Sequence, residues 1–149
     1  MTRARRMLGL AVSPLVAAAL SCALPTADRG GGPIRVYLLG QWDYTAIQTS
    51  PANATLAGVL VVTSQSGTTI SGTLDVTETS GPTVRTLDGV VSGQAPDSAD
   101  VDFDAFFDVT GRRHLGAVDH DTLGGTWVEQ SSGGELRSGT FRAVRRTPT

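Results

Sequence analysis

The sequence of 149 residues contains no lysine, a single cysteine and, beyond residue 34, no segment with the periodicity of a long amphipathic helix. A lone cysteine excludes any disulfide within the chain, so the fold must be stable through packing and hydrogen bonding. The missing helical periodicity argues for an all-β fold. The missing lysine, with all twelve basic residues arginine, is a composition bias that points to no mechanism.

Negative charge predominates in the chain that follows residue 21. Three of the twelve arginines lie in the first six residues, so nine remain against all fourteen acids, a net charge of −5. Nucleic-acid binding depends on clustered cations that neutralise phosphates. An acidic chain without a basic stripe is therefore not expected to bind nucleic acid. The length allows one domain with a modest core.

The first 21 residues have the composition of an export signal. A basic head of Arg3, Arg5 and Arg6 precedes an apolar run, residues 8–20, that is too short to span a membrane stably. Pro14 within the run and the lack of a stop-transfer flank make a membrane anchor or an N-terminal core helix the weaker alternatives. We predict that residues 1–21 are a signal peptide and that the remainder is exported.

The segment Ala-Leu-Ser-Cys-Ala at 19–23 resembles the lipobox of bacterial lipoproteins, in which the cysteine becomes lipidated. The resemblance implies lipidation at Cys22 and an anchor in a membrane that faces the periplasm or the cell exterior. Ala23, where Asp would favour the inner membrane, implies the outer membrane if one is present. Cleavage after Ala19, leaving a free thiol, is the alternative. Residues 22–33, rich in Gly and Pro, are expected to be a flexible tether.

Residues 34–149 consist of short β-branched and aromatic runs separated by Gly, Ser, Pro and Asp. Alternation with period two and short connections indicate antiparallel strands paired with their sequence neighbours. We predict a single antiparallel up-and-down β-barrel of about eight strands, with an open β-sandwich as the alternative. The strands are expected at 34–48, 54–64, 68–78, 83–93, 99–109, 112–118, 122–131 and 135–146.

The acidic segment at 100–108, DVDFDAFFD, alternates carboxylates with apolar residues. Same-face neighbours on a strand lie about 6.5–7 Å apart, whereas calcium is bound by oxygens about 2.4 Å from the ion. The segment also lacks the glycine and distal glutamate of a calcium loop. We interpret its carboxylates as a solvated outer face and predict no metal site.

Turn residues predict the register of the last four strands. Turns are expected at 110–111, 120–121 and 132–134. These turns place the two residues of each of the following pairs opposite each other on neighbouring strands: Asp108–Arg113, Phe107–His114, His114–Trp127, Glu129–Arg137 and Trp127–Gly139. All three turns place one set inside the barrel, namely Phe103, Phe107, His114, Leu123, Trp127 and Phe141.

The chemistry-bearing residues are few. His114 is interpreted as a neutral core histidine, with a ligand contact or axial haem coordination as alternatives. His120, between two aspartates, is interpreted as part of a polar turn. The sequence contains no nucleophile elbow, phosphate loop or zinc spacing. We therefore predict neither an enzyme nor a bound cofactor.

Gly40-Gln-Trp42 near the start of the domain, with Phe141-Arg-Ala-Val-Arg145 near its end, resembles the calycin arrangement of lipocalins and avidins. The resemblance implies that Trp42 closes one end of the barrel, with Arg142 or Arg145 laid across its ring. We expect a lipid-anchored, extracytoplasmic, lipocalin-like protein that binds a small apolar molecule or lipid. The alternative is a structural or interaction lipoprotein whose barrel is filled by its own side chains. The residues expected to line the ligand site are Tyr44, Phe103, Phe107, His114, Trp127 and Phe141.

Overall fold

The computed structural model describes residues 36–51, 53–96, 99–130 and 136–147. The predicted signal peptide, Cys22 and the tether lie outside these ranges, as does the loop at 132–134. Within the described ranges, the chain contains no helix of the length and apolarity needed to cross a membrane.

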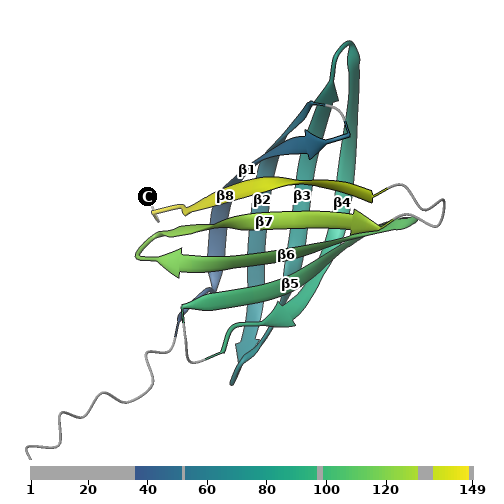
Figure 1. Ribbon diagram of the computed structural model, residues 1–149. Helices are drawn as coiled ribbons and strands as arrows, with labels where there is room; N and C mark the ends of the chain where they lie inside the picture. Colours follow the sequence, from purple (N-terminus) through teal and green to yellow (C-terminus); the bar gives the residue numbers. More distant parts are fainter. Residues whose placement is uncertain (1–35, 52, 97–98, 131–135, 148–149) are drawn as a thin grey trace, which may run out of the picture. The chain divides into compact units, whose positions relative to one another are not determined.

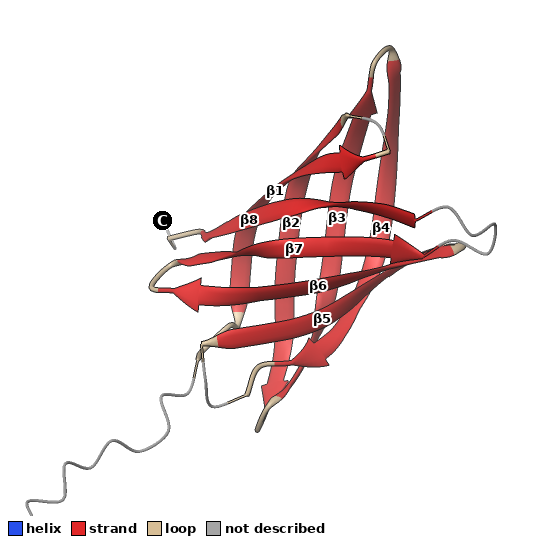
Figure 2. Ribbon diagram, viewed as in Figure 1, coloured by secondary structure: helices blue, strands red, loops and turns tan. Residues whose placement is uncertain are grey.

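Eight antiparallel strands form a closed barrel in which each strand pairs with its sequence neighbours and the last pairs with the first (Figure 1). Figure 2 shows strands joined by short turns throughout the described part of the chain. The predicted up-and-down barrel is confirmed, and pairing of the first with the last strand excludes the open sandwich. The strands are β1 (Gly40–Ser50), β2 (Ala54–Ser66), β3 (Thr69–Ser80), β4 (Thr83–Gln94), β5 (Asp100–Phe107), β6 (Thr110–Asp119), β7 (Thr122–Gln130) and β8 (Leu136–Arg145).

The first strand begins at Gly40 rather than at residue 34, which corrects the expected boundary. The residues just before it fold over the end of the barrel instead of pairing. Leu38 is buried, and its carbonyl oxygen accepts a hydrogen bond of 2.9 Å from Trp42 Nε1. The apolar residues ahead of Gly40 therefore serve as a cover for the interior.

Two of the three tested turns give the predicted register. His114 lies opposite Trp127, Trp127 opposite Gly139, and Glu129 opposite Arg137. The expected β5–β6 pairing is wrong by four residues, because the turn is at 108–109, two residues earlier than expected, and Phe103, not Phe107, lies opposite His114. Asp108 adopts a left-handed conformation (φ 38°) that aspartate tolerates and that allows this earlier turn. An even shift leaves the inward face unchanged.

Inward glycines stand where neighbouring strands approach closely. A Cβ on Gly125 would lie 2.0 Å from the Leu115 carbonyl oxygen, and one on Gly139 2.0 Å from that of Ile47. Each glycine comes two residues before or after large inward aromatics, so small and large residues alternate along β7 and β8. This alternation suits a strongly curved barrel interior.

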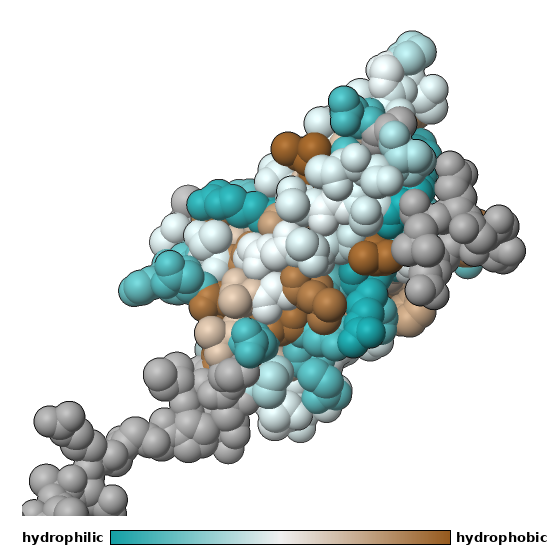
Figure 3. Space-filling model, viewed as in Figure 1, coloured by the Kyte–Doolittle hydropathy of each residue, from teal (hydrophilic) through white to brown (hydrophobic). Residues whose placement is uncertain are grey.

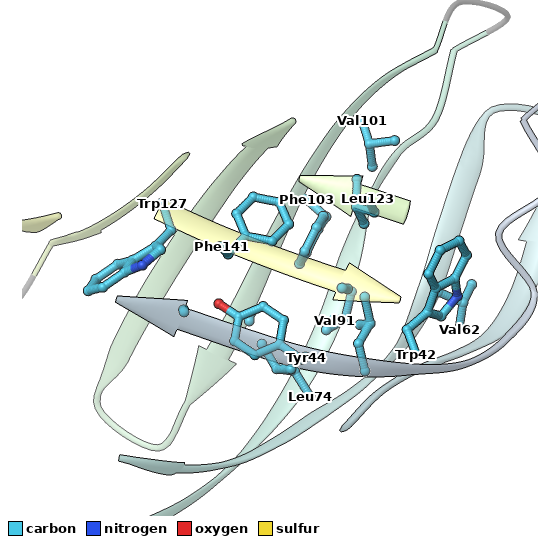
Figure 4. Close-up of a cluster of buried hydrophobic side chains, with 14 of the residues drawn as sticks. Trp42, Tyr44, Val62, Leu74, Val91, Val101, Phe103, Leu123, Trp127 and Phe141 are labelled. Carbon is cyan, nitrogen blue, oxygen red and sulfur yellow. The ribbon is translucent and has the colours of Figure 1, made fainter. Parts of the chain in front are cut away.

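Side chains fill the barrel (Figure 4). Trp42 and Trp127 lie at opposite ends of the buried cluster, with the aliphatic and aromatic residues of the other strands between them. At the Trp42 end, the space bounded by Trp42, Leu60 and Leu123 is too small for a water molecule, with an accessible volume of about 0 Å³. That part of the interior is dry and closely packed.

Candidate functional site

Charged side chains occupy the inside of the barrel at the Trp127 end. At this end, the inward-facing positions are polar rather than apolar. They belong to the strands β1, β3, β4, β6, β7 and β8. Four of these polar residues are almost completely buried, with exposed fractions of 1% for Arg112, 3% for Gln48 and for Glu129, and 4% for Glu78. We call the following residues the ion cluster: Gln48, Glu78, Arg85, Arg112, Glu129 and Arg137.

Arg112 lies at the centre of the ion cluster. Its Nε donates to Glu129 Oε2 at 2.5 Å and its Nη2 to Glu78 Oε2 at 2.7 Å. The guanidinium carbon lies 5.1 Å from the centroid of the Phe107 ring and 5.0 Å from that of Trp127. Paired carboxylates and aromatic faces together compensate the buried charge, as a desolvated guanidinium requires.

Glu78 accepts hydrogen bonds from three arginines. Its Oε1 receives Arg137 Nη2 at 2.8 Å and Arg85 Nε at 3.1 Å, while Oε2 receives Arg112. Burial raises the pKa of this carboxyl, but the hydrogen bonds and charges of Arg137 and Arg112 outweigh burial and hold the pKa below its usual value. Glu78 is therefore ionised at neutral pH.

Positive charge is in excess in the ion cluster. Three guanidinium groups face two carboxylates, Glu78 and Glu129, among the residues that the structure describes. Arg137 also bonds Glu129 Oε1 at 3.3 Å and the Gln48 side-chain oxygen. The side chain of Arg85 is 49% exposed and that of Arg137 17% exposed, so these two arginines meet solvent at the barrel end.

Trp127 supplies a polar group with no partner. Its Nε1 is buried and has no hydrogen-bond acceptor within the described ranges. The indole packs against Gly139, where a Cβ would lie 2.8 Å from Nε1, and the Arg112 guanidinium lies over the ring. An unpaired buried N–H costs about 1–3 kcal/mol, so this position departs from what stability alone favours.

A layer of aromatic rings lies next to the ion cluster. The His114 ring stacks on Phe103 with centroids 4.4 Å apart, and Phe141 meets the same ring edge-on at 5.0 Å. His114 Nδ1 lies 3.0 Å from the Arg112 carbonyl oxygen and so carries the proton, which leaves Nε2 to accept from the Tyr44 hydroxyl at 3.0 Å. Burial lowers the pKa of His114 to about 3 and raises that of Tyr44. Both ring nitrogens are engaged, which leaves neither free to coordinate haem.

The structure brings all six residues predicted to line a ligand site into the barrel. The Phe141 ring contacts the rings of both Tyr44 and Phe103, and Figure 4 shows all three. All six are buried, with exposed fractions of 5% or less. They pack against each other, and a ligand among them would have to displace side chains.

The opposite end of the barrel contains the predicted plug. The Arg145 guanidinium carbon lies 4.2 Å from the centroid of the Trp42 ring, and its Nη1 donates to the Leu39 carbonyl at 2.7 Å. Arg142, the other arginine considered, is exposed on the outer face and bonds the Thr122 hydroxyl at 3.4 Å. Arg145 thus lies across the ring and Arg142 does not.

The carboxylates of β5 face outward. Arg113 pairs with Asp102 at 2.7 Å, so the predicted pairing with Asp108 was wrong, because the β5–β6 turn comes two residues earlier. The structure contains, in the described ranges, no group of three or more His, Cys, Asp or Glu arranged to hold a metal ion. Phe106 and Leu115 are about half exposed beside a hollow of about 510 Å³. Figure 3 shows hydrophobic side chains over this side of the barrel, bordered by polar ones.

Sequence reasoning missed the ion cluster as a unit. The expected loop at 132–134 predicts the pairing of Glu129 with Arg137, but it predicts no role for Glu78 or Arg112. The signal was strand parity: Glu78 shares the inward side of Leu74 and Val76 on β3. A charged residue in phase with a buried apolar row indicates an internal partner.

No protein-family model matches this chain, and no curated protein does. Among solved structures, the barrel is similar to EF1p2_mFAP2b bound to DFHBI, with a TM-score of 0.62 and 14% identity over 73% of this chain and 94% of that chain. It is also similar to a redesigned β-barrel, mFAP1, bound to DFHBI, with a TM-score of 0.58 and 14% identity over 77% of this chain and 100% of that chain. The bradavidin2–biotin complex aligns with a TM-score of 0.48 and 15% identity over 74% of this chain and 100% of that chain. At these identities the likeness shows the fold alone, a small closed β-barrel.

Proposed function

We propose that this chain is an exported, lipid-anchored barrel that binds a small apolar molecule or lipid, with the ion-cluster end as the entrance. The observation that carries the proposal is the buried ion cluster itself. Replacing a buried ion pair by apolar residues of similar volume is often neutral or stabilising. A barrel that only had to be filled would not need Glu78, Arg112 and Glu129 inside it.

The unpaired Nε1 of Trp127 supports the same end of the barrel as the binding site. Desolvated charges and unpaired donors near an opening are typical of functional sites rather than of structural cores. The opposite end is closed by Leu38, Trp42 and Arg145, which leaves the ion-cluster end as the route inward. Barrels of this fold that hold DFHBI show that the architecture accommodates a small molecule.

Lipid anchoring rests on the first residues of the chain. The basic head, the apolar run and Ser21-Cys22 support processing as a bacterial lipoprotein, with the barrel facing the periplasm or the cell exterior and the outer membrane favoured where one exists. We expect Cys22→Ala to move the protein from the membrane fraction to the soluble fraction. Continued membrane association of this variant would refute the anchor.

Co-purification tests the ligand directly. We expect mass spectrometry of organic extracts from the purified protein to detect a small molecule in stoichiometric amount. Arg112→Met, which removes the centre of the ion cluster, should lose it, whereas Arg113→Met, the outward neighbour on the same strand, should retain it. Extracts with no molecule above the background of an unrelated exported protein would contradict the proposal.

A filled barrel that acts through its outer face is the second candidate function. It is favoured by the dry interior at the Trp42 end and by the hollow beside Phe106 and Leu115. A partner protein held there would be lost with Phe106→Ser and unaffected by Arg112→Met. The two candidate functions are therefore distinguished by the variant that abolishes binding, which is Arg112→Met for the small molecule and Phe106→Ser for the partner protein.

A further inference from the structure

The ion cluster already contains a carboxylate that three arginines bind, and this carboxylate belongs to the chain itself. The Glu78 carboxylate accepts from Arg85, Arg112 and Arg137, which come from β4, β6 and β8. Three strands thus direct guanidinium groups at a single carboxylate inside the barrel. Guanidinium groups are suited to planar carboxylates because their donors match the two oxygens.

The charges of the ion cluster leave room for one further anion. The three guanidinium groups carry one more charge than Glu78 and Glu129 neutralise within the described residues. The low-dielectric interior beside the buried members of the cluster strengthens the field of that surplus charge. A third carboxylate, supplied by a ligand, would balance this surplus charge, whereas a dianion would reverse it.

An independent observation also indicates an absent acceptor. Trp127 is 1% exposed, and its indole nitrogen has no acceptor among the described residues. The same indole lies beneath Arg112, so the unpaired donor belongs to the same end of the barrel as the arginines. The surplus charge and the unpaired donor thus lie at the same end of the barrel.

We propose that the ion cluster binds the carboxylate of a monoanionic small molecule, held by Arg85 and Arg137. These two arginines are the ones that meet solvent, and both bond Glu78 through Oε1. The ligand carboxylate takes their free donors while Arg112 keeps Glu78 through Oε2. This inference rests on the proposed function and adds the chemical class of the ligand's polar group.

Calorimetric titration with three probes of equal chain length tests the inference. Octanoate carries the carboxylate, octanol has no charge and octylamine has the opposite charge. We expect octanoate to bind at least about tenfold more tightly than octanol, since a hydrogen bond to a charged group contributes about 1.5–3 kcal/mol. Octylamine should not bind. The affinity for octanoate should fall as salt concentration rises.

Arginine variants locate the site. Arg137→Gln and Arg85→Gln should each weaken octanoate binding about tenfold or more and leave octanol binding unchanged. Arg142→Gln is the matched control, because Arg142 lies on the same strand as Arg137 but faces outward. Should Arg137→Gln fail to fold, Arg85→Gln carries the test, since the Arg85 side chain is half exposed.

Equal affinity for octanoate and octanol would overturn the carboxylate inference and leave the proposed function standing. Absence of octanoate binding would also overturn it, and the co-purification experiment would then decide on the proposed function separately. Loss of octanoate binding in Arg142→Gln would show that the anion binds on the outer face. Acetate serves as a fourth probe that lacks the alkyl chain. If it bound as tightly as octanoate, the site would be a bare anion site rather than one for the carboxylate of a larger molecule, and the inference would likewise be overturned.

Discussion

Replacing Arg112 by methionine removes the charge on which both buried carboxylates depend. Glu78 would keep Arg85 and Arg137, but Glu129 would be left with a single contact, 3.3 Å from Arg137 Nη1. Methionine fills much of the same volume without a donor. Breaking a buried pair by removing one partner costs about 3–5 kcal/mol, because the remaining charge stays desolvated. The lost contacts to the Phe107 and Trp127 rings act in the same direction.

The pH dependence of that loss distinguishes charge from packing. The folded-state pKa of Glu78 lies below its usual value, so this group stabilises the native protein above the unfolded carboxyl pKa of about 4.3. That contribution is lost as the pH falls through the folded pKa. In Arg112→Met, Glu78 loses one of the arginines that hold its pKa down, so less of this pH-dependent contribution remains. The difference in stability between the two proteins should therefore be largest at pH 7 and smaller at pH 4.

Urea unfolding followed by far-ultraviolet circular dichroism measures the difference at both pH values. Arg113→Met is the control: its guanidinium pairs with Asp102 on the outer face, where an exposed pair contributes about 0–1 kcal/mol. A loss below about 1 kcal/mol for Arg112→Met at pH 7 would refute the reasoning, since that is the range of an exposed pair. So would a loss of equal size at pH 4 and pH 7, which would assign the effect to packing alone.

Three further predictions follow from the packing. Gly139→Ala should lower stability by about 1–3 kcal/mol in thermal unfolding, because its Cβ would lie 2.0 Å from a backbone oxygen, whereas Gly124→Ala, with its nearest contact at 3.6 Å, should change it by less than about 0.5 kcal/mol. The His114 imidazole, whose pKa lies near 3, should show constant NMR shifts from pH 8 to pH 5; a midpoint near 6.5 would show that the ring is not buried. Since that folded pKa lies below the unfolded value, the contribution of His114 to stability is present above about pH 6.5 and falls as the pH drops towards 3. Arg145→Gln should shift the emission of Trp42, because it removes the cation from the ring face; unchanged emission would contradict the cation–π contact.

The barrel could be predicted because its signals are local. Period-two alternation and short turns specify antiparallel neighbours without knowledge of distant contacts. The predicted position of the β5–β6 turn is wrong for a local reason too. Gly111 indicates a turn at 110–111, whereas Asp108 itself adopts the left-handed conformation and the turn lies two residues earlier. The expected pairing is off by an even number of residues, so Phe103 and Phe107 still face inward. An even error in strand pairing changes which residues lie opposite each other but not which side chains face inward.

The ion cluster could not be assembled from sequence in the same way. Its central bond joins Arg112 on β6 to Glu78 on β3, strands that are not neighbours in the sheet. Contacts across the interior depend on the barrel's closure and curvature, which turn residues do not encode. Parity places Glu78 and Glu129 inside, but only the closed barrel shows that three arginines reach them.

The seam between β1 and β8 has a consequence for how the chain reaches its native state. Hairpins from β1 to β8 can form one after another, each from adjacent segments. The seam instead joins the first strand to the last, with Trp42 opposite Arg145. Such distant contacts form late, because the entropy of closing the intervening loop must first be overcome. Until then both outer strands expose unpaired backbone to other chains. The arrival of Arg145 over Trp42 is thus the step that ends the period in which this chain is open to misassembly.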